Sequence, residues 1–159
     1  MIPLRNNYGA VIAWTLVDDF DYPVLSLKKW FLTASKQYVA GCFKQKNGKY
    51  IQVKLHRFIL KANKSQMVDH INGNSLDNRR KNLRFCESYQ NSSNTKIPSN
   101  NTSGFKGIYP TKRGNWGARI QSRGKRIFLG YFNDPVLAAS IYNKASKRMH
   151  GAFARLNDI

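Results

Sequence analysis

Apolar and polar positions alternate most clearly in the last third of the chain, where β-forming residues occur in three short runs. These runs predict strands at residues 107–109, 116–121 and 126–130. The polar stretches 111–115 and 122–124 separate the runs and predict turns. Asp134 then suits a helix N-cap, Pro135 suits the first helical position, and Gly151 suits the C-terminal end. The pattern therefore predicts a three-stranded antiparallel sheet followed by one helix.

The predicted helix carries a single apolar stripe whose members are three or four residues apart. The stripe consists of Ala138, Ile141, Tyr142, Ala145 and Met149. Small residues on this helix allow it to lie close to the sheet. Alternation within the strands also separates an exposed set of residues from a core-facing set. The core-facing set is Ile120, Ile127 and Leu129.

The first ninety residues carry shorter signals of both kinds. Strands are predicted at residues 11–17, 38–43, 50–55, 68–71 and 83–85. Asn47-Gly48 lies between the second and third of these strands, which is typical of a hairpin turn. A turn or short helix is expected between residues 18 and 29, and further helical turns at 56–60 and 87–94. The mixture predicts an α+β fold.

Residues 92–103 differ in composition from both flanks. They are rich in Ser, Asn and Thr, contain a single proline and have almost no apolar side chains. Such a segment cannot bury a core, so it is typical of a linker. We therefore predict a domain of residues 1–91, a linker of residues 92–103 and a domain of residues 104–159.

Charge indicates the kind of partner. The 159 residues carry a formal net charge of +19, and residues 104–159 are the most basic part, with eleven basic and two acidic side chains. Such an excess favours a polyanionic partner. The apolar fraction of 42% is too high for a disordered basic tail. No apolar run is long enough for a transmembrane helix. Without a secretory signal, we expect a cytoplasmic protein in which Cys42 and Cys86 are reduced thiols.

Candidate chemistry begins with the adjacent pair Asp69-His70, which the turn-forming sequence Asn72-Gly73-Asn74 follows closely. A carboxylate is a hard oxygen ligand that suits Mg²⁺. An imidazole can take a proton from water near neutral pH. Neighbouring side chains on a strand point to opposite faces, so the two groups can have different roles.

The order of Asp69, His70, Asn82 and Asn91 resembles the HNH endonuclease family, and in particular its phage and intron homing-endonuclease branch. Asn82 follows His70 by 12 residues and Asn91 follows it by 21. The resemblance implies a ββα-metal (His-Me finger) motif, in which two strands and a helix surround one divalent ion. It implies that Asp69 and Asn91 hold the metal and that His70 is the general base. Asn82 would orient the His70 ring through a backbone or side-chain hydrogen bond.

The implied cofactor is a divalent metal, Mg²⁺, with Mn²⁺ as the alternative. Arg79, Arg80 and Arg84 follow the pair closely and can neutralise DNA phosphates. His56 precedes His70 by 14 residues. We interpret it as a structural residue or a phosphate contact rather than a catalytic group.

Residues 104–157 resemble the AP-two/ethylene-response-factor DNA-binding domain over almost their whole length. The matching stretches are 104–108, 115–120, 125–132, 138–142 and 151–157. That domain places its sheet in the DNA major groove and its helix behind. The resemblance therefore implies DNA contacts from the sheet and from its turns. The sheet residues are Lys106, Tyr109, Arg119, Gln121, Arg126 and Phe128, and the turn residues are Lys112, Arg113, Arg123 and Lys125. Arg119 and Tyr109 depart from the plant pattern, so the target sequence does not transfer.

These features together predict a DNA endonuclease whose nuclease domain is delivered by a sheet-based DNA-binding domain, with a homing role implied by the resemblance. We expect a monomer on double-stranded DNA, with no membrane and no small-molecule substrate. One alternative is a sequence-specific DNA-binding regulator with an inactive nuclease domain, which the intact Asp69, His70, Asn82 and Asn91 argue against. Another is a basic RNA-binding protein, although no aromatic motif for stacking single strands is recognisable.

Overall fold

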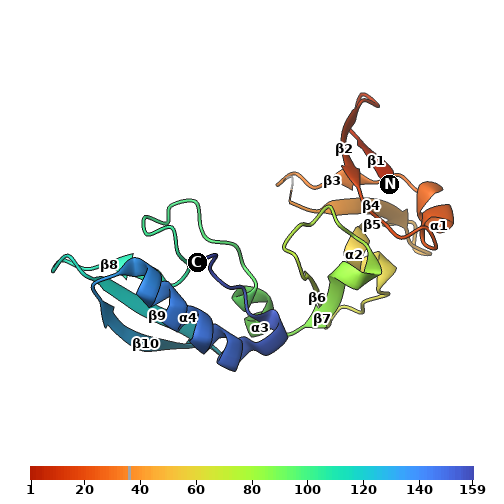
Figure 1. Cartoon of the computed structure of the whole chain (residues 1–159). Helices are drawn as coiled ribbons and strands as arrows, with labels where there is room; N and C mark the ends of the chain where they lie inside the picture. Colours follow the sequence, from red (N-terminus) through yellow and green to blue (C-terminus); the bar gives the residue numbers. More distant parts are fainter. Residues whose placement is uncertain (36) are drawn as a thin grey trace. The chain divides into compact units, whose positions relative to one another are not determined.

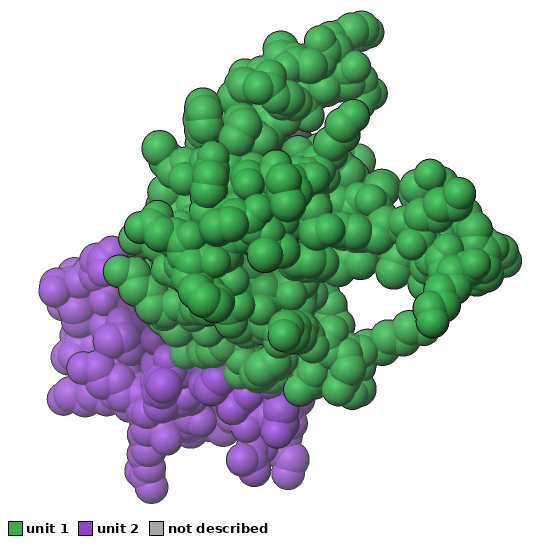
Figure 2. All heavy atoms as spheres, turned by 90° about the vertical axis from the view of Figure 1, so that its right-hand side faces the viewer, with its two compact units in different colours: residues 1–86 green, residues 87–159 purple. Residues whose placement is uncertain are grey.

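A computed structural model describes residues 1–35 and 37–159 as an α+β protein (Figure 1). The chain forms two compact units, Met1–Cys86 and Glu87–Ile159, which Figure 2 distinguishes by colour. Each unit has its own apolar core and is therefore stabilised by its own packing. Over the described residues, none of the helices combines the length and apolar character that crossing a membrane requires.

Over its described residues, the first unit contains three small antiparallel sheets. One pairs β1 (Ile2–Arg5) with β2 (Val11–Thr15), and another has the strand order β3-β4-β5. The strands of this second sheet are β3 (Phe31–Leu32), β4 (Val39–Lys44) and β5 (Tyr50–Lys54). The hairpin predicted at Asn47-Gly48 is confirmed, because β4 and β5 are paired on either side of it. β1 and β3 were not predicted, since strands of four and two residues are too short to show alternation.

Short helices pack against the core of the first unit. They are α1 (Tyr22–Ser26) and α2 (Leu55–Ile59). Leu25 and Leu55 are each at most 1% exposed, and the Trp30 indole N–H donates to the Leu25 carbonyl at 2.9 Å. The core also includes Leu83 from the third sheet, so the helices, the sheets and the candidate site share one apolar cluster.

The third sheet is the hairpin of β6 (Met67–His70) and β7 (Leu83–Cys86). Its connection ends in the 3₁₀ turn η1 (Arg80–Asn82). Backbone hydrogen bonds of 2.8 Å join Leu16 N–H to the Leu76 carbonyl and Asn78 N–H to the Leu16 carbonyl. The long connection of this hairpin is therefore attached to the end of β2.

The second unit confirms the sheet and helix predicted for the last third of the chain. Its sheet has the order β10-β9-β8 and is antiparallel throughout. The strands are β8 (Ile108–Pro110), β9 (Trp116–Ser122) and β10 (Lys125–Phe132). The long helix α4 (Pro135–His150) lies along the sheet (Figure 1), and α3 (Ser88–Ser93) and η2 (Gly151–Phe153) complete the unit.

Local signals account for the start of α4 and for the turn between β9 and β10. The Asp134 carboxylate accepts hydrogen bonds from the N–H groups of Val136 and Leu137 at 3.0 and 3.1 Å, as expected of an N-cap. Between β9 and β10, Arg123 and Gly124 have φ values of 49° and 77°. Positive φ at two consecutive residues is what a tight two-residue hairpin loop requires, and glycine accommodates it without strain.

The chain passes from the first unit to the second between Cys86 and Glu87, so the Ser- and Asn-rich stretch belongs to the second unit. The Lys106 ammonium donates to the carbonyls of Ser93 and Thr95 at 2.6 and 2.8 Å. Ser93 Oγ also lies 3.1 Å from His150 Nδ1. These contacts attach α3 to the sheet and to α4, and the division predicted at residues 92 and 103 remains a prediction.

Candidate functional site

The candidate site of the first unit is built around His70, the last residue of β6. His70 is 5% exposed and Asp69 is 7% exposed. Burial lowers the pKa of His70 below its ordinary value, and this effect outweighs the opposing hydrogen bond from Asn78 and the charges of Asp69 and Asp77. The imidazole is therefore neutral at pH 7 and able to accept a proton.

The side chain of Asn78 contacts the His70 ring. His70 Nε2 lies 3.2 Å from Asn78 Oδ1, and Asn78 is fully buried. In the sequence, Asn78 is one of several turn-forming asparagines, and nothing distinguished it from its neighbours. Its role becomes visible only when the hairpin connection folds back over His70.

Asn82 instead fixes the backbone that follows His70. Its Oδ1 accepts from Asn72 N–H at 3.0 Å, and its Nδ2 donates to the Asp77 carbonyl at 2.7 Å. The Asn82 carbonyl also accepts from Ile71 N–H at 2.8 Å. Asn82 thus holds the start and the middle of the connection against its end. The effect of Asn82 on the orientation of the His70 ring remains a prediction.

Asp69 is paired across the hairpin with Arg84. The guanidinium donates to Asp69 Oδ2 through Nε at 3.0 Å and through an Nη at 2.8 Å, and the Arg84 side chain is only 15% exposed. Among residues 1–35 and 37–159, no group of three or more His, Cys, Asp or Glu side chains is arranged to hold a metal. The predicted pair of Asp69 and Asn91 contains only one side chain of these four types, so this finding does not test it.

The other two predicted arginines of this unit also form ion pairs. Arg79 donates to both carboxylate oxygens of Asp77 at 2.8 and 2.7 Å, and these bonds hold the pKa of Asp77 below its ordinary value. Arg80 pairs with both carboxylate oxygens of Asp21 at 2.8 Å. The Arg79 and Arg80 side chains remain 36% and 45% exposed, so both still present surface to a polyanion.

His56 and Tyr38 complete the surroundings of His70. The rings of His56 and His70 have centroids 4.9 Å apart and are nearly perpendicular, at 80°. His56 is 4% exposed, and burial, with a smaller contribution from His70, lowers its pKa to about 3. Tyr38 lies against both imidazoles, with centroid distances of 5.5 and 6.4 Å. Burial supports the structural interpretation of His56 over a phosphate contact.

Asn91, the second predicted metal ligand, lies on α3 and therefore in the second unit. It is half-buried, and its backbone N–H donates to the Glu87 carbonyl at 3.0 Å. Its partnership with Asp69 in a metal site stays a prediction.

The exposed face of the β8–β10 sheet carries the polar residues that alternation predicts. Arg126 is paired with Gln121, and Phe128 with Arg119, so four exposed side chains lie together on one face. The register shifts between Phe128 and Gly130, which brings Tyr131 beside Phe128 with ring centroids 4.8 Å apart. Tyr131 is 62% exposed, and alternation alone could not place it on this face.

Tyr109 supports Arg119 on this face. The Arg119 guanidinium lies 4.9 Å from the centre of the Tyr109 ring. Tyr109 is paired with Gly117, and a Cβ atom on Gly117 would lie 2.4 Å from the nearest atom of that ring. Because Gly117 has no side chain, the Tyr109 ring can lie across β9, where it contacts the Arg119 guanidinium.

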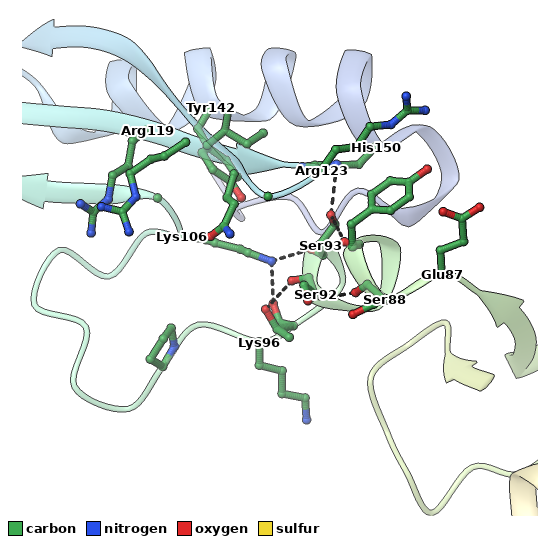
Figure 3. Close-up of a pocket in the computed structure, with 18 residues that line it drawn as sticks. Glu87, Ser88, Ser92, Ser93, Lys96, Lys106, Arg119, Arg123, Tyr142 and His150 are labelled. Carbon is green, nitrogen blue, oxygen red and sulfur yellow. Dashed lines mark hydrogen bonds between the residues drawn. The ribbon is translucent and has the colours of Figure 1, made fainter. Parts of the chain in front are cut away.

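A groove of about 1020 Å³ lies between this sheet, α3 and the segment after it (Figure 3). Its basic lining residues are Lys96, Lys106, Arg119, Arg123 and Arg126. The Lys106 ammonium is turned toward the end of α3, where the Ser93 carbonyl accepts from it (Figure 3), and burial lowers the pKa of Lys106 to about 8.

The predicted turn residues Lys112, Arg113, Arg123 and Lys125 are all exposed. Arg123 lies over the Tyr89 ring of α3, with its guanidinium carbon 5.5 Å from the ring centre. The turns therefore present a set of cations beside the sheet face.

This chain is similar to two viral proteins, and the match spans most of the length of each. Protein 3.8 of Escherichia phage T7 is 36% identical over 93 residues, which represent 58% of this chain and 76% of that protein. A protein of Acanthamoeba polyphaga mimivirus, described as the uncharacterized HNH endonuclease L560, is 32% identical over 144 residues. That match covers 87% of this chain and 71% of L560.

Plant proteins match a shorter part of the chain. The AP2/ERF and B3 domain-containing transcription repressor TEM1 of Arabidopsis thaliana is 42% identical over 62 residues, or 39% of this chain and 16% of that protein. Dehydration-responsive element-binding protein 2A of the same plant is also 42% identical over 62 residues. No protein-family model matches the chain.

Proposed function

The chain belongs to the HNH endonuclease family, and from this premise we propose that it hydrolyses phosphodiester bonds of double-stranded DNA. In this proposal the β6–β7 hairpin supplies the chemistry, and the AP2/ERF-like sheet of the second unit supplies DNA affinity. The regulator with an inactive nuclease domain is the alternative that the experiment below separates from it.

The burial of His70 and its contact to Asn78 Oδ1 are the observation that carries the proposal. A general base must be unprotonated at working pH and held in one orientation. Burial satisfies the first requirement, and the contacts to Asn78 and His56 satisfy the second. We propose that His70 removes a proton from the water that attacks the phosphorus.

Asp69 and Asn91 are the proposed ligands of the divalent ion, Mg²⁺ or Mn²⁺. A carboxylate and an amide oxygen are hard ligands that fit such an ion and leave positions for water and phosphate. When bound, the ion would supply Lewis-acid stabilisation of the leaving 3′ oxygen. Arg84 holds the Asp69 carboxylate in place through their ion pair, which supports a positioning role for Arg84 beside its proposed phosphate contact.

DNA binding is assigned to the basic residues of both units. Arg79 and Arg80 keep exposed surface for phosphates, while Arg119, Gln121, Arg126 and Phe128 form the proposed surface for base edges. Further contacts are proposed for Lys106, Tyr109, Lys112, Arg113, Arg123 and Lys125. A homing role follows from the family resemblance and is part of the proposal.

The test is cleavage of supercoiled plasmid with and without Mg²⁺ by the wild type, by His70→Ala and by the surface control Lys64→Ala. We expect His70→Ala to bind DNA normally and to cut about 10²-fold more slowly or worse, as for a lost general base. Equal cutting by wild type and His70→Ala would refute the assignment. A wild type that binds DNA but cuts it with neither Mg²⁺ nor Mn²⁺ would favour the regulator.

A further inference from the structure

A chain of buried side-chain hydrogen bonds leads from β2 to His70. Thr15 Oγ donates to the Leu76 carbonyl at 2.8 Å and lies 2.9 Å from Asn78 Nδ2. Asn78 Nδ2 also lies 3.0 Å from the Ser75 carbonyl, and Asn78 Oδ1 is the atom that faces His70. Thr15 and Asn78 are both fully buried, so water cannot replace these partners.

The chemistry of these partners fixes which way the Asn78 amide points. The Ser75 carbonyl can only accept, and the Thr15 hydroxyl already donates its proton to another carbonyl. The side-chain atom of Asn78 that faces both must therefore be the NH₂ group. Its oxygen is left toward His70, so the nitrogen of His70 that meets it must carry a hydrogen.

We propose that Asn78, oriented by Thr15, is the positioning residue that selects the tautomer of His70. In this tautomer Nε2 carries the proton and donates to Asn78 Oδ1, and Nδ1 is the unprotonated, basic nitrogen of the ring. This inference rests on the proposed nuclease function and names side chains outside the Asp69, His70, Asn82 and Asn91 set.

The loss of kcat that follows from losing tautomer selection can be scaled from a known enzyme. When the triad histidine of a serine protease is held in the wrong tautomer, kcat falls by about 10⁴. Without Asn78, His70 would distribute between both tautomers instead of being locked in the wrong one. We therefore expect Asn78→Ala to lower kcat by about 10- to 10³-fold, a range below that value, with DNA affinity unchanged.

The experiment measures the tautomer directly, by two-bond ¹H–¹⁵N spectra of ¹⁵N-histidine-labelled full-length protein without added metal. The signal of His70 is identified by its loss in His70→Ala. The wild type should show the Nε2–H form at pH 7.5, and Asn78→Ala should show averaged shifts of both forms. Asn82→Ala is the matched control, since Asn82 is also buried but its side chain donates to and accepts from backbone groups, and this variant should keep the Nε2–H form.

An Nδ1–H form in the wild type would overturn the proposal without any variant, which covers the case that Asn78→Ala does not fold. An unchanged tautomer in folded Asn78→Ala would overturn it as well. Thr15→Val removes one acceptor of the Asn78 amide, so it should reduce kcat less than Asn78→Ala does. Thr15→Ser keeps a hydroxyl at this position and should retain the wild-type kcat. If the protein shows the Nε2–H form but cuts no DNA, the positioning of His70 by Asn78 is supported and the proposed function is refuted.

Discussion

Replacing Gly117 by alanine tests the arrangement of the proposed DNA-binding face. The new methyl group would lie 2.4 to 2.7 Å from three atoms of the Tyr109 side chain, whereas ordinary contacts begin at 3.4 Å. The ring must therefore move by about 1 Å. Tyr109 is half-buried and can swing outward, so the cost in folding free energy should lie near the low end of the roughly 1–3 kcal/mol typical of overpacking.

The larger effect should fall on Arg119, because its guanidinium rests on the displaced ring. The lost cation–π contact is worth about 0.5–1 kcal/mol at an exposed site. If Arg119 binds a base edge, its mispositioning also removes part of the roughly 1–3 kcal/mol of such a contact. At 1.4 kcal/mol per tenfold, the Kd for DNA should rise between about 2-fold and 100-fold.

The assay is fluorescence anisotropy at fixed salt, with a duplex selected from random sequence by the wild type. Arg119→Ala and the double variant complete a double-mutant cycle. If Gly117 acts through Arg119, the double variant should bind no more weakly than Arg119→Ala alone. Wild-type affinity in Gly117→Ala, or strictly additive losses in the double variant, would refute the reasoning.

Three further predictions concern stability. Asp77→Asn removes a carboxylate whose folded pKa lies below its ordinary 3.8, so the stability that it contributes is present above that value and is lost as the pH falls below it. Thermal unfolding between pH 6 and pH 3 should therefore depend less on pH in this variant. Asp134→Ala should destabilise a fragment of residues 87–159 by about 1 kcal/mol in urea, and the exposed control Asp158→Ala should not. That fragment should also unfold at higher urea than residues 104–159, and equal midpoints would contradict the role given to α3.

The sheet and main helix of the second unit were predictable because their signals are local. Seven- and eight-residue strands show clear alternation, and Asp134 places the helix start without tertiary information. The face of Tyr131 was not predictable, since one register shift in β10 reverses the alternation beyond it. Conversely, Lys106 has the sequence context of a sheet residue, but the carbonyls that hold its ammonium come from residues that precede it by 11 and 13 positions.

In the first unit, the sequence shows where the candidate site lies but not which side chains support it. The spacing of Asp69, His70 and Asn82 is visible in the sequence, and the structure places all three on one hairpin and its connection. Asn78 and Asn82 are chemically identical, so composition cannot tell which one meets the ring and which one clamps the backbone. That distinction depends on how the connection is bound to β2, a contact across about sixty residues.

The attachment of α3 to the second unit determines where this chain can be divided. Ser93 and Thr95 supply carbonyls to Lys106, and Ser93 also meets His150. A chimaera that joins the second unit to a different domain after the Ser- and Asn-rich stretch would leave the half-buried Lys106 ammonium without its acceptors. A fusion point between Cys86 and Glu87 keeps all of these hydrogen bonds within the transferred unit. That position is therefore the best place to separate or recombine the two units.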